Sequence, residues 1–112
     1  MTHLRYSVAC CQTDMPNPID RKGMKANTDR VLSMIDSAVA GAAPFLPVRL
    51  VVFPEFAHAA PVFPTVAELL EKLAVKIPNE HTERLEAKAR EHDIYIQTGT
   101  ILETDPKWPG HV

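Results

Sequence analysis

The sequence lacks the features that mark several classes of protein. No apolar run approaches the roughly 18–20 residues of a membrane-spanning helix, and no apolar segment of a signal peptide is present near the N-terminus. Lysine and arginine total 12 against 14 acidic residues, which gives a formal net charge of −2. Because a basic excess is needed to bind nucleic acid or an anionic membrane, we expect neither partner.

Cysteine and glycine are also scarce. The two cysteines, Cys10 and Cys11, are adjacent and have no third cysteine to pair with, which favours a reducing, cytoplasmic setting. The four glycines form no phosphate-binding loop after the first predicted strand, so no nucleotide cofactor is expected. The five histidines lack the close spacing of zinc ligands, so no metal is predicted.

The stretch Arg49–Phe56 is the centre of the chain. Its apolar run Leu50–Phe53 predicts a strand buried on both faces, and Pro54 ends that strand because proline has no backbone N–H. Glu55 follows at the carboxyl end of the strand, where catalytic groups gather in open α/β sheets. In apolar surroundings its pKa would be raised, as suits a general base near neutral pH. The alternative is a solvent-exposed charge that merely ends the strand.

A strand and a helix are predicted before this centre. The strand covers Leu4–Gln12, and the apolar period that follows predicts a helix from Asp20, or from nearer Lys25, to about Ala40. Gly41 is the predicted C-cap of this helix. The cysteines in the first strand are interpreted as small buried apolar residues rather than nucleophiles.

Three further elements are predicted downstream: a short helix capped by Thr65 with Glu68 and ending between Leu73 and Lys76, a helix capped by Asn79 that covers Glu80–Glu91, and a strand over Asp93–Leu102. Strands alternating with helices are typical of a parallel sheet, so the predicted fold class is α/β with βαβαβ order. Three strands make a small sheet whose edges need cover, and the chain stops in a loop. We therefore expect the 112 residues to be part of a larger domain.

Three segments in one collinear order resemble the nitrilase superfamily, the carbon–nitrogen hydrolases. They are a first strand ending in Gln12 with Asn27 in the next helix, the strand with Pro-Glu at Leu50–Phe56, and the helix and strand of Ile77–Ile96 followed by Gly99. The resemblance covers nearly the whole chain. It implies that residues 1–112 are the N-terminal portion of the hydrolase domain, the βαβαβ half of an αββα sandwich.

Members of this superfamily use a Glu, a Lys and a Cys, and the resemblance implies that Glu55 is the general base. The base takes the thiol proton, the thiolate attacks an amide or nitrile carbon, and the lysine stabilises the oxyanion. Cys10 and Cys11 precede the Glu within the first strand, and Lys107 lies in a turn, so none matches the other two roles. The chain is therefore expected to end before the Lys and the Cys, and to be inactive alone.

The resemblance implies a small amide or nitrile as substrate, with an aliphatic amide favoured, and a homo-oligomer as the assembly. Two other readings are a small α/β binding or assembly module, and a truncated, non-catalytic paralogue that acts by associating with other chains. His58, three residues after Glu55, either lines the pocket or is a solvated loop residue, and the second interpretation is favoured.

Overall fold

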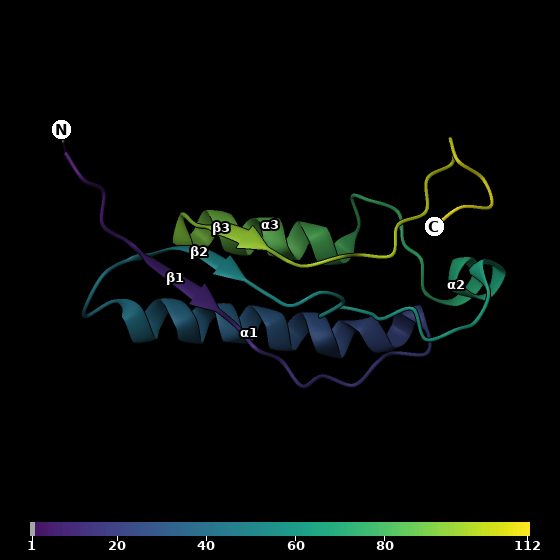
Figure 1. Cartoon of the computed structure of the whole chain (residues 1–112), viewed down its shortest axis with the longest axis horizontal. Helices are drawn as coiled ribbons and strands as arrows, with labels where there is room; N and C mark the ends of the chain where they lie inside the picture. The colour runs from purple at the N-terminus through teal and green to yellow at the C-terminus, as the bar shows by residue number, and fades with distance from the viewer. Residues whose placement is uncertain (1) are drawn as a thin grey trace.

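The computed structural model describes residues 2–112 and has strands and helices alternating along the chain (Figure 1). In chain order the elements are β1 (Ser7–Cys10), the 3-10 helix η1 (Arg21–Gly23), α1 (Met24–Ala42), β2 (Val48–Val52), α2 (Val66–Lys72), α3 (Glu80–His92) and β3 (Tyr95–Gln97). None of the helices within these residues combines the length and the apolar character that crossing a membrane requires. The predicted α/β class is confirmed.

The three strands form one parallel sheet in the order β1-β2-β3, with β2 in the centre. Leu50 of β2 pairs with Val8 on one side and with Tyr95 on the other. Figure 1 shows α1 and α3 running along the sheet, and an ion pair of 2.6 Å between Asp29 and Arg84 joins the two helices. The predicted βαβαβ order is therefore confirmed, with the short α2 inserted between β2 and α3.

Both long helices cover the same face of the sheet. Val31 and Ile35 of α1 and Leu85 of α3 pack in one hydrophobic cluster with Val51 of β2 and Ile96 of β3. The register shifts between the first two pairs of β1 and β2, and the extra residue on β2 lets Val48 join the same cluster. One helix layer on one sheet is the arrangement expected for half of an αββα sandwich.

The other face of the sheet carries apolar side chains in contact with solvent. Because successive side chains of a strand point to opposite faces, this face presents Val8, Cys10, Leu50, Val52 and Tyr95. Val8 is 47% exposed, Tyr95 is 80% exposed, and the two β2 residues are only half-buried. The prediction of a central strand buried on both faces is therefore wrong for this chain, because the described residues supply only one helix layer.

Several predicted boundaries are wrong by a few residues. Gly41 lies inside α1, and the C-cap is Ala43, whose backbone stays in the right-handed helical region (φ −52°, ψ −38°). At the C-terminus of α3, Asp93 is the C-cap and adopts a left-handed backbone (φ 53°). The strand β3 therefore begins only at Tyr95. β1 is likewise shorter than predicted.

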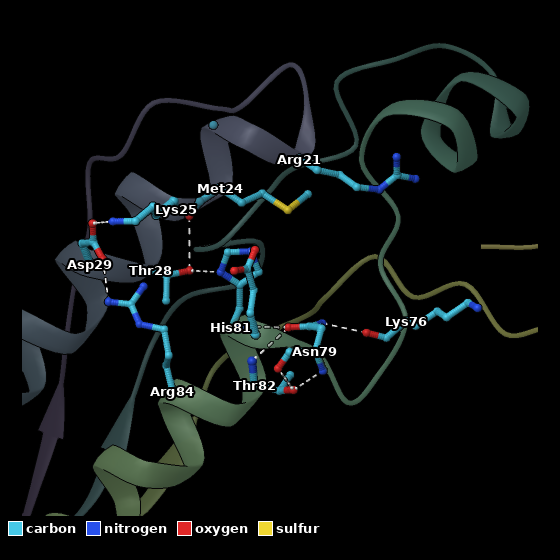
Figure 2. A network of polar contacts seen from close by, with 12 residues as sticks. Arg21, Met24, Lys25, Thr28, Asp29, Lys76, Asn79, His81, Thr82 and Arg84 are labelled. Carbon is cyan, nitrogen blue, oxygen red and sulfur yellow. Dashed lines mark hydrogen bonds and ion pairs between the residues drawn. The ribbon is translucent and has the colours of Figure 1, made fainter.

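The predicted N-caps of α2 and α3, Thr65 and Asn79, are confirmed. Thr65 accepts a hydrogen bond from the backbone N–H of Glu68 (3.2 Å) and donates one to its carboxylate (2.7 Å). The Asn79 side chain accepts from the N–H groups of His81 (2.8 Å) and Thr82 (3.0 Å), while the Thr82 hydroxyl accepts from the Asn79 N–H (2.8 Å), as Figure 2 shows. Each cap satisfies donors that have no partner within the helix.

Arg21 ties the start of α1 to the end of α2. Its guanidinium donates hydrogen bonds to three backbone carbonyls at the C-terminus of α2: those of Leu70 (2.6 Å), Glu71 (2.6 Å) and Ala74 (2.8 Å). Figure 2 shows this side chain extending from η1, just before α1, toward α2. Carbonyls at a helix C-terminus lack helical partners and carry partial negative charge, so a guanidinium suits them.

We expect Arg21→Ala to lower the free energy of unfolding by about 1–2 kcal/mol, since charge-assisted hydrogen bonds to orphan carbonyls are lost. Urea unfolding followed by circular dichroism measures the change. Lys22→Ala is the matched control, because Lys22 is an exposed cation of the same 3-10 helix. Equal destabilisation by the two variants would contradict the capping role of Arg21.

Candidate functional site

Glu55 lies on a tight turn at the carboxyl edge of the sheet. The last backbone groups of β2 pair on both sides: the Val52 carbonyl accepts from Cys11 N–H (2.8 Å), and Phe53 N–H donates to the Gln97 carbonyl (2.9 Å). The chain then turns, and Phe56 adopts a left-handed backbone with φ 55°. Such a conformation is uncommon for an aromatic residue and marks a position that the surrounding structure holds in place.

The carboxylate of Glu55 is exposed in this chain. Phe53 is buried in the hydrophobic core with Val51, and Phe56 is half-buried. The prediction of apolar surroundings for Glu55 is therefore wrong for these residues. The physical reason is that Phe53 follows the helix-facing side of β2 and packs against the helix layer.

A hollow at the edge of the sheet has Glu55 in its wall. The loop after β1 forms one side of this hollow, and the turn after β2 forms the other. It is lined by Thr13, Asp14, Met15, Asn17, Pro54, Glu55, Phe56, Ala57 and Ala60. The arrangement gives a carboxylate that can accept a proton from a group bound between the two loops.

Asn27 fastens these two loops to each other. Its side chain is 4% exposed, and its amide donates hydrogen bonds to the carbonyls of Pro16 and His58, both at 3.0 Å. Pro16 belongs to the loop after β1, and His58 belongs to the segment after Glu55. A single amide on α1 therefore fixes both walls of the hollow. The sequence marked Asn27 only as part of a resemblance, because a polar residue beside an apolar helix stripe does not reveal its partners.

Gly99 supports the Glu55 turn from the segment that follows β3. It has φ +81°, and a Cβ atom at this position would overlap the Pro54 carbonyl oxygen and lie 3.3 Å from the Cα of Glu55. Only glycine allows both that backbone conformation and that close approach. The backbone of the segment after β3 therefore packs directly against the backbone of the turn at Pro54 and Glu55.

His58 is buried rather than solvated, so the favoured interpretation of a solvated loop residue is wrong. Its side chain packs edge-on against His81 of α3, with ring centroids 4.5 Å apart and an interplanar angle of 61°. The two histidines line a small cavity together with Thr28, Val31 and Leu85. Burial, followed by the proximity of His81, lowers the pKa of His58 to about 4.

The other candidate nucleophiles and cations do not join Glu55 in its hollow. Cys10 is exposed, contrary to its interpretation as a buried residue, and Cys11 is half-buried. Both line a neighbouring hollow with Pro54. Burial, with a smaller contribution from Cys10, raises the pKa of Cys11, which is opposite to the activation of a nucleophilic thiol. Lys107 is exposed in the C-terminal turn, where its backbone N–H donates to Asp105.

Within residues 2–112, one group of three side chains is close enough to share a metal ion. Asp36, Glu91 and His92 bring their ligand atoms within 4.8 Å of one another. The ammonium of Lys88 lies 2.9 Å from Asp36 and 2.8 Å from Glu91. Hydrogen bonds from His92 and then Lys88 lower the pKa of Asp36, so this group forms an ion-pair network between α1 and α3.

Comparison with known proteins gives one family. A family model described as carbon–nitrogen hydrolase matches residues 7–110, which is nearly the whole chain. The match includes Glu55, Asn27 and Gly99. A search of the curated proteins found no match.

We expect Gly99→Ala to lower the free energy of unfolding by about 2–4 kcal/mol, because a left-handed backbone and a steric overlap with Pro54 both oppose the new methyl group. Gly110→Ala provides the matched control. Gly110 has nearly the same φ of +80° but nothing within 4 Å of the added Cβ, so about 1 kcal/mol is expected there. Thermal and urea unfolding measure both values, and equal losses would contradict a steric role for Gly99.

Proposed function

The chain belongs to the carbon–nitrogen hydrolase family, and on this premise we propose that it supplies the general base, Glu55, of an enzyme that hydrolyses carbon–nitrogen bonds other than peptide bonds. One observation carries the proposal. Glu55 stands on a constrained turn at the carboxyl edge of a parallel sheet, in the wall of a hollow, with Asn27 and Gly99 holding the turn. Such edges are where α/β proteins gather catalytic groups.

In the proposed reaction, Glu55 accepts the proton of a cysteine thiol that lies outside residues 1–112. The thiolate attacks the carbon of an amide or nitrile, and a lysine, also outside these residues, stabilises the negative oxygen or nitrogen that develops. With an amide, the C–N bond of the intermediate then breaks, ammonia or an amine leaves with the proton that Glu55 took up, and a thioester remains. Glu55 then activates the water that hydrolyses the thioester. Because Glu55 is exposed among residues 2–112, the proposal requires further protein to enclose it and exclude water from the site.

We propose that residues 1–112 are the N-terminal portion of the hydrolase domain, which continues to the lysine and the cysteine. The face of the sheet away from α1 and α3 supports this. It presents apolar side chains such as Val8 and Tyr95 to solvent, which a second sheet layer of an αββα sandwich would bury.

A small amide is the proposed substrate, with aliphatic amides favoured over nitriles. Polar side chains of the loop after β1, such as Thr13, Asp14 and Asn17, line the hollow opposite Glu55 and suit a small polar molecule. A homo-oligomer and a cytoplasmic location complete the proposal. The second rests on the two unpaired cysteines.

The uncovered apolar face favours a second candidate function. The same surface would let a non-catalytic paralogue or a small assembly module associate with other chains. Intact mass from the natural source and size in solution separate the two candidates. A mass matching 112 residues would leave the chain without a nucleophile of the proposed type and would favour assembly.

The purified 112-residue chain is expected to release no ammonia from simple aliphatic amides, because no cysteine or lysine among residues 2–112 lines the hollow with Glu55. Ammonia release above a buffer blank is the measurement. Release that disappears in the variant Glu55→Gln would contradict the expectation, since it would mean that the chain is catalytically complete.

In the protein from its natural source, Glu55→Gln is expected to lower kcat/KM for a small amide by about 10²–10⁴-fold, the usual contribution of a general base. Glutamine keeps the shape of the side chain but cannot accept the thiol proton. Glu83→Gln, on the exposed face of α3, is the matched control and should leave the rate unchanged. An active Glu55→Gln enzyme would overturn the assignment of the base.

A further inference from the structure

The segment directly after Glu55 is buried and carries an imidazole. Ala57, His58 and Ala59 are 6%, 7% and 3% exposed, although they follow an exposed turn. Two hydrogen bonds hold this segment: Ala57 N–H donates to the Pro54 carbonyl (3.3 Å), and the His58 carbonyl accepts from Asn27 (3.0 Å). The position of the His58 ring and the position of the Glu55 turn are therefore linked, because only Phe56 and Ala57 lie between these two residues.

The two histidines of the cavity differ in their hydrogen bonding. Thr28 donates its hydroxyl proton to the Met24 carbonyl (3.2 Å) and therefore accepts from Nδ1 of His81 (2.8 Å), as Figure 2 shows. Nε2 of His58 is buried and, within residues 2–112, has no hydrogen-bond partner. A buried polar atom without a partner costs free energy, and this atom can also take up a proton.

Among residues 2–112, no carboxylate lines the cavity beside His58 to compensate a proton on its ring. The cavity wall is formed largely by aliphatic side chains such as Val31, Leu85 and Ile101, and the nearest ring is a second imidazole. Charged groups around the pair come from both helices. On α3 they are Glu80, whose carboxylate is 3.6 Å from Nε2 of His81, and Arg84; on α1 the group is Asp29, which Lys25 and Arg84 already neutralise.

We propose that protonation of His58 at Nε2 releases the Glu55 turn in acid. The protonated ring leaves its buried position beside His81, the hydrogen bond from Asn27 to the His58 carbonyl breaks, and the turn becomes free to move. The arrangement with the ring buried is the closed state, and the arrangement with the ring in solvent is the open state. The proposal is supported by the burial of Nε2 without a partner within residues 2–112, by the anchoring of the His58 carbonyl by Asn27, and by the short distance along the chain, since only Phe56 and Ala57 separate His58 from Glu55. The inference does not rest on the proposed hydrolase function.

The direction of the effect follows from linkage. The pKa of His58 is lowered to about 4 in the closed state, whereas a solvated histidine titrates near 6.5. The closed state is fully favoured above pH 6.5 and loses ground as the pH falls toward 4. Each pH unit in this window raises the open-to-closed ratio by up to tenfold, so the full window corresponds to roughly 300-fold.

Amide hydrogen exchange of the 112-residue chain, corrected for the intrinsic pH dependence of exchange, tests the proposal. Between pH 7 and pH 4.5 the protection factor of Ala57 is expected to fall by about 10–100-fold. Amides that bond within the sheet, such as Cys11, should keep their protection over the same range. His58→Phe fills the cavity with a ring that cannot be protonated, and it should abolish the pH dependence at Ala57.

His111→Phe, in the exposed C-terminal turn, is the matched control and should leave the pH dependence unchanged. Loss of protection that is equal at Ala57 and Cys11, or that persists in His58→Phe, would overturn the proposal. If His58→Phe does not fold, the imidazole titration of the native chain decides by nuclear magnetic resonance. A His58 midpoint within the pH range of the Ala57 opening supports the release, and a midpoint outside that range overturns it.

Discussion

The end of the β2 hydrogen-bond ladder is the constraint on which the position of Glu55 depends. β2 is central, so its last groups pair with both neighbours, through Cys11 N–H to the Val52 carbonyl and Phe53 N–H to the Gln97 carbonyl. Pro54 then has no N–H to offer, and the ladder must stop there. Glu55, the next residue, therefore leaves the sheet at a point that the pairing of three strands fixes.

Two residues outside β2 support the Glu55 turn. Asn27 does so through hydrogen bonds, and Gly99 does so through close steric packing. The buried amide of Asn27 joins the two loops that form the hollow, so neither loop can move without losing a hydrogen bond. Gly99 lets the backbone after β3 press against Pro54. Both supports lie outside β2, one on α1 and one after β3, so the site depends on the packing of the whole sheet and helix layer.

The sequence was sufficient to predict the order of the elements and the caps at Thr65 and Asn79, because these depend on local patterns. It failed where the outcome depends on what covers a residue. Glu55 was expected among apolar side chains, yet Phe53 packs into the core and the carboxylate is exposed. A loop histidine was expected in solvent, yet His58 is buried because Asn27 and His81 hold it from two helices that are remote in sequence.

The incomplete enclosure of Glu55 and the complete enclosure of His58 have one origin. The helix layer covers only one face of the sheet, and His58 turns toward that layer while Glu55 stays at its rim. A second layer over Val8, Leu50 and Tyr95 would add protein at the rim and shield the carboxylate from water. The same layer would leave the cavity of His58 unchanged, because that cavity is closed by α1 and α3. The exposure of Glu55 would therefore depend on the layer that covers the open face of the sheet, whereas the stability of its turn, on our proposal, depends on the protonation of His58.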